Sequence, residues 1–176
     1  MSSHESLELA RLASPLGELL VVSNGEGRLC ALDFGECEAR LAKLLRSQLG
    51  VSREALVSAP APRRTAESLE AFFAGELAAL DEIETQPGGT PFQRAVWAAL
   101  RGIPHGETLT YSALARQLGR PSAVRAVGHA NGQNAIAIVV PCHRVLGADG
   151  SLTGYAGGLP RKRWLLEHER KWRNAA

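Results

Sequence analysis

The first third of the chain alternates apolar and polar residues in short runs, a pattern typical of β-strands. Two such runs, residues 7–14 and 18–24, are separated by the turn sequence Pro15-Leu16-Gly17, and a third run, 27–35, follows the turn signal Asn24-Gly25. Consecutive strands joined by turns this short pair in opposite directions. The pattern therefore predicts a three-stranded antiparallel meander.

Helical spacing then replaces this alternation. Apolar residues recur at intervals of three and four over 37–49 and over 66–75, and the Pro-containing stretch 58–65 between them indicates a loop. The Gly- and Pro-rich stretch 85–92 interrupts this pattern, and the residues after it again show helical spacing. We therefore predict an α+β protein with two domains. Residues 1–84 form a small antiparallel-sheet domain with a structural role, and residues 85–176 form a mostly helical domain.

The second half of the chain contains three predicted helices and one predicted strand. The first helix covers 91–103, with Pro91 in its first turn. The second begins after Thr110, a predicted N-cap, and a Gly-containing turn joins it to the third, 122–130, in a helix-turn-helix. An ordinary helical hairpin would show the same spacing. The apolar run 136–140 indicates a buried strand.

Small side chains distinguish the third helix from a core helix, and Arg125 stands alone among them. Base edges in the major groove are usually read by long polar side chains, whereas a smooth helix with one Arg suits the minor groove, where shape and insertion matter more. The small residues are Ala123, Val124, Ala126, Gly128 and Ala130.

Composition places the protein among ordinary globular chains. The 176 residues are 45% hydrophobic, contain no apolar run long enough to span a membrane, and begin without a secretory signal pattern. Three cysteines without a CxxC pair favour reduced thiols over disulfides. We therefore expect a cytoplasmic protein with no membrane partner.

The two signs of charge are unevenly distributed along the chain, although the net charge is only +2. Residues 77–84 are acidic, whereas 116–125 and 161–173 are mainly basic. Such a distribution is expected where one face of a protein meets a polyanion.

The residues after the predicted strand, Pro141-Cys142-His143, carry the candidate chemistry. A thiol is a strong nucleophile only as a thiolate, a form that basic neighbours favour. Adjacent side chains of an extended segment point to opposite faces, so Cys142 and His143 cooperate only across a bend at Pro141 or through a water. A buried cysteine beside an incidental histidine is one alternative. A zinc site is another, but Cys30, Cys37, Cys142 and His143 lack a recognised ligand spacing.

The segment from Gly89 to Glu169 resembles the catalytic domain of the O6-alkylguanine-DNA alkyltransferase family, the self-methylating DNA repair proteins. The motif PCHRV at Pro141–Val145 carries the resemblance, together with RAVGHA, an upstream Asn and a downstream GYAGG. The resemblance implies a small ribonuclease H-like domain followed by a helical domain with a helix-turn-helix and an active-site loop. It also implies irreversible, single-turnover transfer of a methyl or other alkyl group from O6-alkylguanine, and from O4-alkylthymine, in double-stranded DNA to Cys142.

The resemblance assigns roles to five residues of the catalytic site. Cys142 is the acceptor thiol, His143 draws the thiol proton through a water, and Glu169 orients His143. Tyr111 hydrogen-bonds the guanine ring and helps to neutralise the leaving base. Asn134 holds the turn before the active site. No cofactor and no metal are implied.

The resemblance places the DNA contacts on the helix-turn-helix. Arg125 enters the duplex in place of the damaged nucleotide, which flips into the pocket. The expected DNA-contacting residues are Tyr111, Ser112, Ala123, Val124, Arg125, Ala126 and Gly128, and the expected pocket residues are Val145, Tyr155, Gly157 and Gly158. We expect a monomer, and leave open whether copies associate cooperatively on DNA.

Two positions depart from the family pattern. Ala135 follows Asn134 where many members have proline, and Ala156 stands where some relatives carry a serine. The first change makes the turn less rigid, since proline restricts the backbone. The second removes a hydroxyl from the pocket, so the fine substrate preference stays open.

Three other functions fit parts of the sequence. A non-catalytic lesion sensor of related fold would lack the acceptor cysteine, and a cysteine hydrolase would carry a nucleophile-elbow or protease signature. A transcription factor would show Gln, Asn or several Arg on its recognition helix. The presence of Cys142 disfavours the sensor, the lack of a hydrolase signature around this thiol disfavours the hydrolase, and the small residues of 122–130 disfavour the transcription factor.

Overall fold

The chain divides into two compact units, Met1–Gly89 and Thr90–Ala176. The structure, a computed structural model, describes residues 6–175. The division falls inside the Gly- and Pro-rich stretch 85–92 that marks a change of character in the sequence. No helix among the described residues is both long and apolar enough to cross a membrane.

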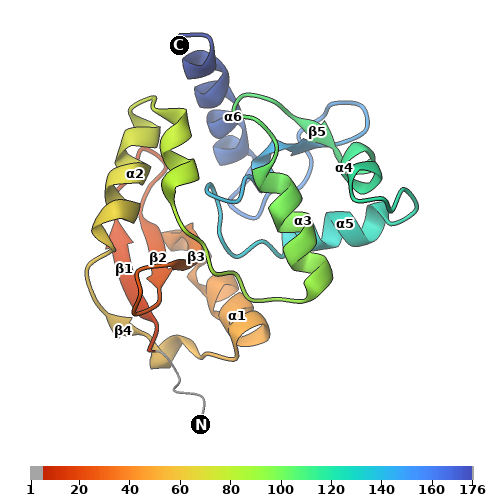
Figure 1. Ribbon diagram of the computed structural model, residues 1–176. Helices are drawn as coiled ribbons and strands as arrows, with labels where there is room; N and C mark the ends of the chain where they lie inside the picture. The colour runs from red at the N-terminus through yellow and green to blue at the C-terminus, as the bar shows by residue number, and fades with distance from the viewer. Residues whose placement is uncertain (1–5, 176) are drawn as a thin grey trace. The chain divides into compact units, whose positions relative to one another are not determined.

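A four-stranded sheet organises the N-terminal unit, in the order β3-β2-β1-β4 (Figure 1). β1 (Glu8–Leu12), β2 (Leu19–Ser23) and β3 (Leu29–Phe34) form the predicted antiparallel meander, which is confirmed. A fourth strand that was not predicted, β4 (Val57–Ser58), pairs with β1 in parallel. Two residues are too few to show a period-2 pattern, and the sequence therefore gave no sign of this strand.

Two helices and three short 3-10 segments complete the N-terminal unit. α1 (Glu38–Leu49) confirms the predicted helix and ends at Gly50, whose φ of 68° is the left-handed conformation of a helix C-cap. α2 (Arg63–Phe73) begins inside the predicted loop 58–65, because the Ala66 amide already donates to the Pro62 carbonyl. The 3-10 segments are η1 (Gly35–Cys37), η2 (Arg53–Ala55) and η3 (Leu77–Glu82).

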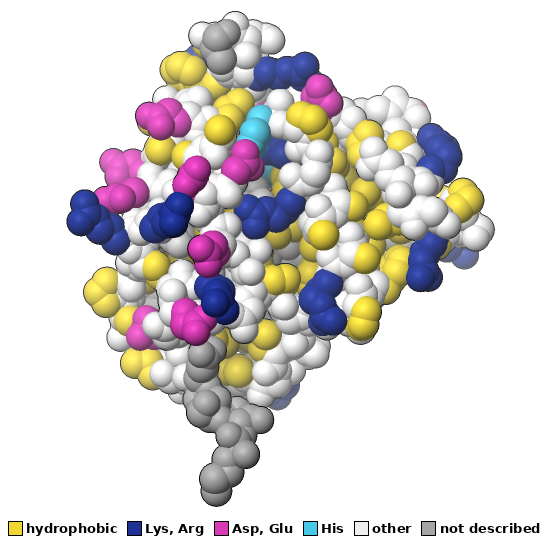
Figure 2. Space-filling model, viewed as in Figure 1, with side chains coloured by type: hydrophobic (Ala, Val, Ile, Leu, Met, Phe, Trp, Pro, Cys, Tyr) yellow, Lys and Arg dark blue, Asp and Glu magenta, His cyan; other side chains and the backbone are white. Residues whose placement is uncertain are grey.

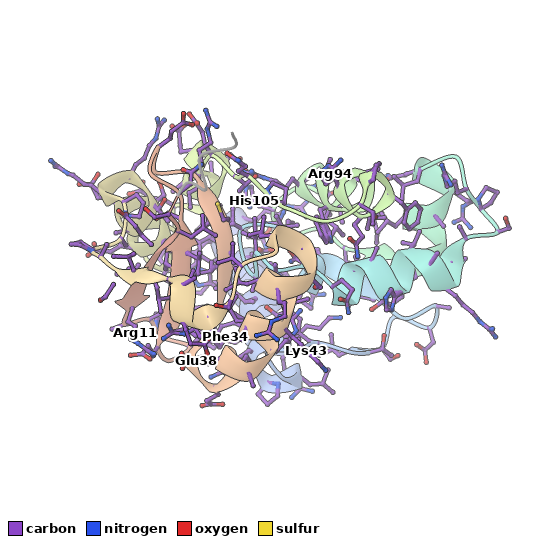
Figure 3. The ribbon with its side chains drawn as sticks, turned by 90° about the horizontal axis from the view of Figure 1, so that it is seen from below. Arg11, Phe34, Glu38, Lys43, Arg94 and His105 are labelled. Atoms are coloured by element: carbon purple, nitrogen blue, oxygen red, sulfur yellow. The ribbon has the colours of Figure 1, made fainter. Side chains whose placement is uncertain are left out.

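Charged side chains of both signs cover the visible face of the N-terminal unit (Figure 2). Arg11 of β1 and Glu38 of α1 point toward one another (Figure 3), with 3.3 Å between nitrogen and oxygen. Arg53 also binds Glu38, at 2.7 Å. Exposed pairs of this kind contribute little stability individually, so the buried sheet remains the main support of this unit.

The C-terminal unit contains four helices and a short parallel pair of strands. α3 (Pro91–Arg101) packs against α5 (Val124–Gly132), and the indole Nε1 of Trp97 donates to the Ala130 carbonyl at 2.8 Å. α4 (Tyr111–Gln117) also packs against α5 and completes the helix-turn-helix (Figure 1). β5 (Leu109–Thr110), β6 (Val145–Leu146), η4 (Cys142–Arg144) and α6 (Leu159–Arg173) form the remainder.

The predicted caps of α3 and α4 are confirmed. Thr90 and Gln93 form a capping box ahead of α3, and the Thr110 side chain accepts from the Ala113 amide. The start of the third helix was predicted wrongly. The Ala123 amide donates to the Arg120 carbonyl and closes a turn, so α5 begins at Val124 rather than at residue 122.

The predicted strand 136–140 is also wrong, although its burial was expected correctly. The segment folds into tight turns: the Val139 amide donates to the Ala137 carbonyl at 2.8 Å, and the Val140 amide donates to the Ile136 carbonyl at 3.0 Å. Local bonds within the turn thus replace most of a strand ladder. An apolar run indicates burial, but it does not identify the backbone that is buried.

Candidate active site

The side chain of Asn134 holds the turn that leads to Cys142. Its amide nitrogen donates to the carbonyls of Val140, at 2.8 Å, and Ile136, at 3.3 Å, while its amide oxygen accepts from the Ile136 backbone at 3.0 Å. Ile138, inside the turn, has a φ of 71°, a strained conformation for a β-branched residue. Such strain persists only where the surroundings fix the backbone, as the buried Asn134 does here.

The turn delivers Cys142 and His143 to different environments. Pro141 precedes the 3-10 turn η4, and the Arg144 amide donates to the Pro141 carbonyl at 3.0 Å. Cys142 is partly exposed, whereas His143 and Arg144 are buried. The bend expected at Pro141 therefore leaves the thiol accessible while the imidazole enters the interior.

His143 and Glu169 form a buried pair. His143 Nε2 lies 2.7 Å from Glu169 Oε1, and both side chains are 0% exposed. Burial alone would raise the pKa of Glu169, but the hydrogen bonds and charges of His143 and Arg144 outweigh it and hold this pKa well below its ordinary value. Burial lowers the pKa of His143. Glu169 opposes this effect, and the positive charges of Arg144 and Lys162 reinforce it.

The lowered pKa values of Glu169 and His143 indicate which ring nitrogen of His143 carries a hydrogen. An ionised Glu169 only accepts hydrogen bonds, so a neutral His143 carries its proton on Nε2 and donates it to Glu169. The other ring nitrogen, Nδ1, is buried and has no hydrogen-bond partner within the described part of the chain. Because Nδ1 then holds a free lone pair, it is the atom of this site that can take up a proton.

Two buried cations of the site have no assigned role in the sequence reasoning. Arg144 binds Glu169 with Nε and Nη2, both at 2.9 Å. Lys162 donates from Nζ to the carbonyls of Val145, at 2.7 Å, and Thr153, at 2.8 Å, and burial lowers its pKa. The spacing of Lys162 relative to the apolar residues of α6 could have indicated burial, but lysine is so rarely buried that the signal is weak.

The segment 153–158, which contains the expected pocket residues, is tied to α6 at two points. Lys162 binds the Thr153 carbonyl, as above, and Arg161 Nη1 donates to the Gly157 carbonyl at 3.1 Å. Gly158 has a φ of 92° directly before α6, a conformation that glycine adopts without strain. Tyr155 is half-buried and Gly157 is buried. Val145 lies in β6, and its carbonyl bond to Lys162 links the strand to the same helix.

The expected DNA-contacting residues gather on α4 and at the start of α5. A Cβ atom added to Gly128 would lie 3.7 Å from the Tyr111 ring, so this ring faces α5 at its small residue. The Ser112 hydroxyl lies 3.1 Å from that of Thr110, beside the cap of α4. Arg125 and Ala126 are exposed, and Ala123 and Val124 are half-buried.

No group of three or more His, Cys, Asp or Glu side chains that could hold a metal ion occurs within residues 6–175. The described cysteines form no disulfide: Cys30 is buried, and Cys37 and Cys142 are partly exposed.

Both halves of the chain match models of one protein family. Residues 9–87 match "6-O-methylguanine DNA methyltransferase, ribonuclease-like domain", and residues 91–171 match "6-O-methylguanine DNA methyltransferase, DNA binding domain". The chain belongs to the 6-O-methylguanine DNA methyltransferase family. The resemblance drawn from PCHRV and its neighbours is thereby confirmed, and so is the fold class of a small sheet domain followed by a helical domain.

Relatives in this methyltransferase family align over nearly the whole chain. The Methylated-DNA--protein-cysteine methyltransferase of Salmonella typhimurium is 52% identical over 159 residues, 90% of this chain and 93% of its own. That of Methanosarcina barkeri is 44% identical over 158 residues, 90% of this chain and 94% of its own. Mycobacterium tuberculosis OGT, solved in complex with DNA, has a TM-score of 0.78 and 42% identity, with 94% of each chain covered.

We expect Asn134→Ala to destabilise this methyltransferase-family fold by about 2–4 kcal/mol, because two buried carbonyls each lose one of their two donors, the Ile136 amide loses its acceptor, and a buried side chain is removed. Urea unfolding at pH 7 measures the change. The exposed Asn174→Ala serves as the control and should stay within about 0.5 kcal/mol of the parent protein. Equal losses in the two variants would contradict the role of Asn134.

Stability should fall on acidification below about pH 6.5, the ordinary pKa of histidine, because the unfolded chain takes up a proton that folded His143 resists. The lowered pKa of Glu169 adds a further loss below about pH 4.5, where unfolded glutamate protonates. Both contributions are fully present at higher pH and disappear as the pH falls. Urea midpoints from pH 8 to pH 4 measure both contributions.

His143→Gln should flatten the plot of urea midpoint against pH between pH 6.5 and 5, whereas the exposed control His129→Gln should not. Parallel plots for the two variants would refute the assignment of this stability loss to His143.

Proposed function

We propose that this protein repairs double-stranded DNA by transferring a methyl or other alkyl group from O6-alkylguanine, and from O4-alkylthymine, to its own Cys142. The observation that carries the proposal is the joint placement of an accessible thiol, a buried His143 with Nδ1 unpartnered, and an ionised Glu169 on Nε2. The relatives named Methylated-DNA--protein-cysteine methyltransferase support it, as does the relative solved in complex with DNA.

The proposed reaction is a displacement at the alkyl carbon. The proton of Cys142 passes through a water to Nδ1 of His143, while Nε2 remains hydrogen-bonded to Glu169. The thiolate then forms an S–C bond as the C–O6 bond breaks, and guanine leaves with the electron pair of that bond. The Tyr111 hydroxyl donates a hydrogen bond to the leaving ring and stabilises its negative charge. Water does not hydrolyse the S–C bond of the product thioether, so the thiol is not regenerated and each molecule reacts once.

The charge of the C-terminal unit supports DNA as the partner. From Thr90 onward the chain carries 12 of its 20 Lys and Arg residues but only 4 of its 18 Asp and Glu residues. Exposed arginines at residues 116, 120 and 125 follow the helix-turn-helix. Cations arranged in this way bind phosphates and release counterions, which gives affinity without reading the sequence. The small residues of α5 then allow the helix to approach the minor groove closely.

Nucleotide flipping follows from the same surface. Arg125 is exposed near the start of α5 and can occupy the space of an extruded nucleotide. The flipped base would lie between Tyr111 and the segment with Tyr155, Gly157 and Gly158, with its alkyl group toward Cys142. A structural role for the N-terminal unit, a monomeric state and a cytoplasmic location remain predictions from the sequence.

Cys142→Ser should abolish alkyl transfer while leaving DNA binding nearly intact, because a hydroxyl lacks the soft nucleophilicity of a thiolate. Intact mass after incubation with methylated duplex DNA measures transfer, and a mobility-shift titration measures binding. The parent protein should gain one methyl group. Cys30→Ser and Cys37→Ser serve as controls and should gain it too. A parent protein that binds the DNA without gaining mass would identify a lesion sensor instead.

Arg125→Ala should slow repair of duplex DNA by roughly 10- to 100-fold, since flipping costs a few kcal/mol and about 1.4 kcal/mol is tenfold. Transfer from the free base O6-benzylguanine should keep its rate because it needs no extrusion. Single-turnover rates at saturating duplex and with the free base make the comparison. The matched control Arg116→Ala, at an exposed position of α4, should weaken binding and reduce its salt dependence while keeping the saturated rate. A full saturated rate in Arg125→Ala would make Arg125 a phosphate anchor instead.

A further inference from the structure

Arg144 connects three separate segments of the C-terminal unit. It belongs to η4, and it binds Glu169 of α6 through Nε and Nη2, both at 2.9 Å. Its Nη1 donates to the Ile103 carbonyl at 2.6 Å, and its Nη2 lies 2.7 Å from His105 Nδ1. The side chain is 2% exposed. Such a buried guanidinium with four hydrogen bonds costs more stability to desolvate than an apolar packing residue would, so it calls for a reason beyond packing.

Glu169 receives hydrogen bonds on both carboxylate oxygens. Oε1 accepts from His143 Nε2 and Arg144 Nη2, while Oε2 accepts from Arg144 Nε and, at 3.3 Å, from the Gly106 amide. The fork-shaped contact from Arg144 fixes the carboxylate plane. Because His143 is bonded to one oxygen of that plane, the orientation of its ring also depends on Arg144.

The charges of the cluster favour an uncharged His143. A buried carboxylate facing a histidine alone would draw a proton onto the imidazole. Here the guanidinium of Arg144 already balances that carboxylate. Lys162 of α6 adds a second positive charge, which like that of Arg144 disfavours a proton on His143. Cys142 is the neighbour of His143 in η4. A protonated His143 would have no lone pair at Nδ1 and could not take the thiol proton.

We propose that Arg144 is a positioning residue that balances the charge of Glu169 and so keeps His143 an uncharged base with its lone pair on Nδ1. This inference rests on the proposed alkyl transfer. His105 adds a condition, since a guanidinium only donates hydrogen bonds and His105 must therefore accept at Nδ1.

The protonation state of His143 can be measured without any alkyl transfer. Protein labelled with 15N at histidine gives imidazole nitrogen shifts that separate the Nε2–H tautomer from the imidazolium, and His143→Gln identifies the signal. Intact protein should show neutral His143 from pH 8 down to at least pH 6. Arg144→Met should move this titration upward by about one pH unit or more, as expected when a neighbouring charge is lost. An imidazolium at pH 7 in the parent protein would overturn the proposal, even if Arg144→Met fails to fold.

The rate of transfer from O6-benzylguanine as a function of pH tests the consequence. Arg144→Met should shift the acid limb of the profile upward by about one pH unit, because His143 must lose its proton before it can act. Arg144→Lys should keep the limb in place and lower the rate, since it retains the charge but loses the fork. Arg173→Met, on the exposed end of α6 where Arg173 binds the Gly106 carbonyl, should resemble the parent protein.

A different set of results would assign Arg144 to packing alone. In that case Arg144→Met and Arg144→Lys would lower the rate equally at every pH, and the His143 titration would not move. A parent protein that shows neutral His143 but transfers no alkyl group at any pH would contradict the proposed function and leave the role of Arg144 toward His143 intact.

Discussion

The buried carboxylate of Glu169 is the constraint on which the rest of the active site depends. A charge that is 0% exposed cannot be left unpaired, because desolvation would cost several kcal/mol, and here two other segments bring its partners to it. Arg144 and His143 come from η4, and the Gly106 amide comes from the loop before β5. Satisfying one carboxylate thus fixes α6, the turn of Cys142 and the chain leading to Tyr111 against one another.

Asn134 fixes the backbone of the turn before Cys142, as Glu169 fixes the side chains around it. The turn 136–140 is buried, and the Asn134 amide gives the Ile136 and Val140 carbonyls a second donor beside the backbone amides of Val140 and Cys142. These bonds on both sides of Ile138 help to hold its strained φ. They also explain how an apolar run that resembles a strand ends in a 3-10 turn with a partly exposed thiol. The side chain that decides the conformation lies outside the run, at its N-terminal end.

Sequence reasoning succeeded where a local pattern determines the structure. The meander of β1–β3 and the helices α1, α3 and α4 follow from periodicity and from caps such as Thr90 and Thr110. It failed for β4, which is too short for a pattern, and for the starts of α2 and α5, which have no side-chain cap to mark them. The motif led to Cys142, His143 and Glu169. The burial of Arg144 and Lys162 was not predicted, because charged side chains are usually exposed and only the fold shows that these two are not.

The energetic design suits a reaction that each molecule carries out once. Burying two cations, a carboxylate and a histidine in a small domain costs stability that apolar residues of similar volume would not cost. A turnover enzyme must also open and release product, which a tightly bonded interior resists. For the proposed transfer, the alkyl group stays on Cys142, and only the DNA has to leave α4 and α5. The motion and the chemistry would then be separate: α4, α5 and Arg125 would supply binding and flipping, while the hydrogen-bonded Glu169 network would hold the base in place before any DNA arrives.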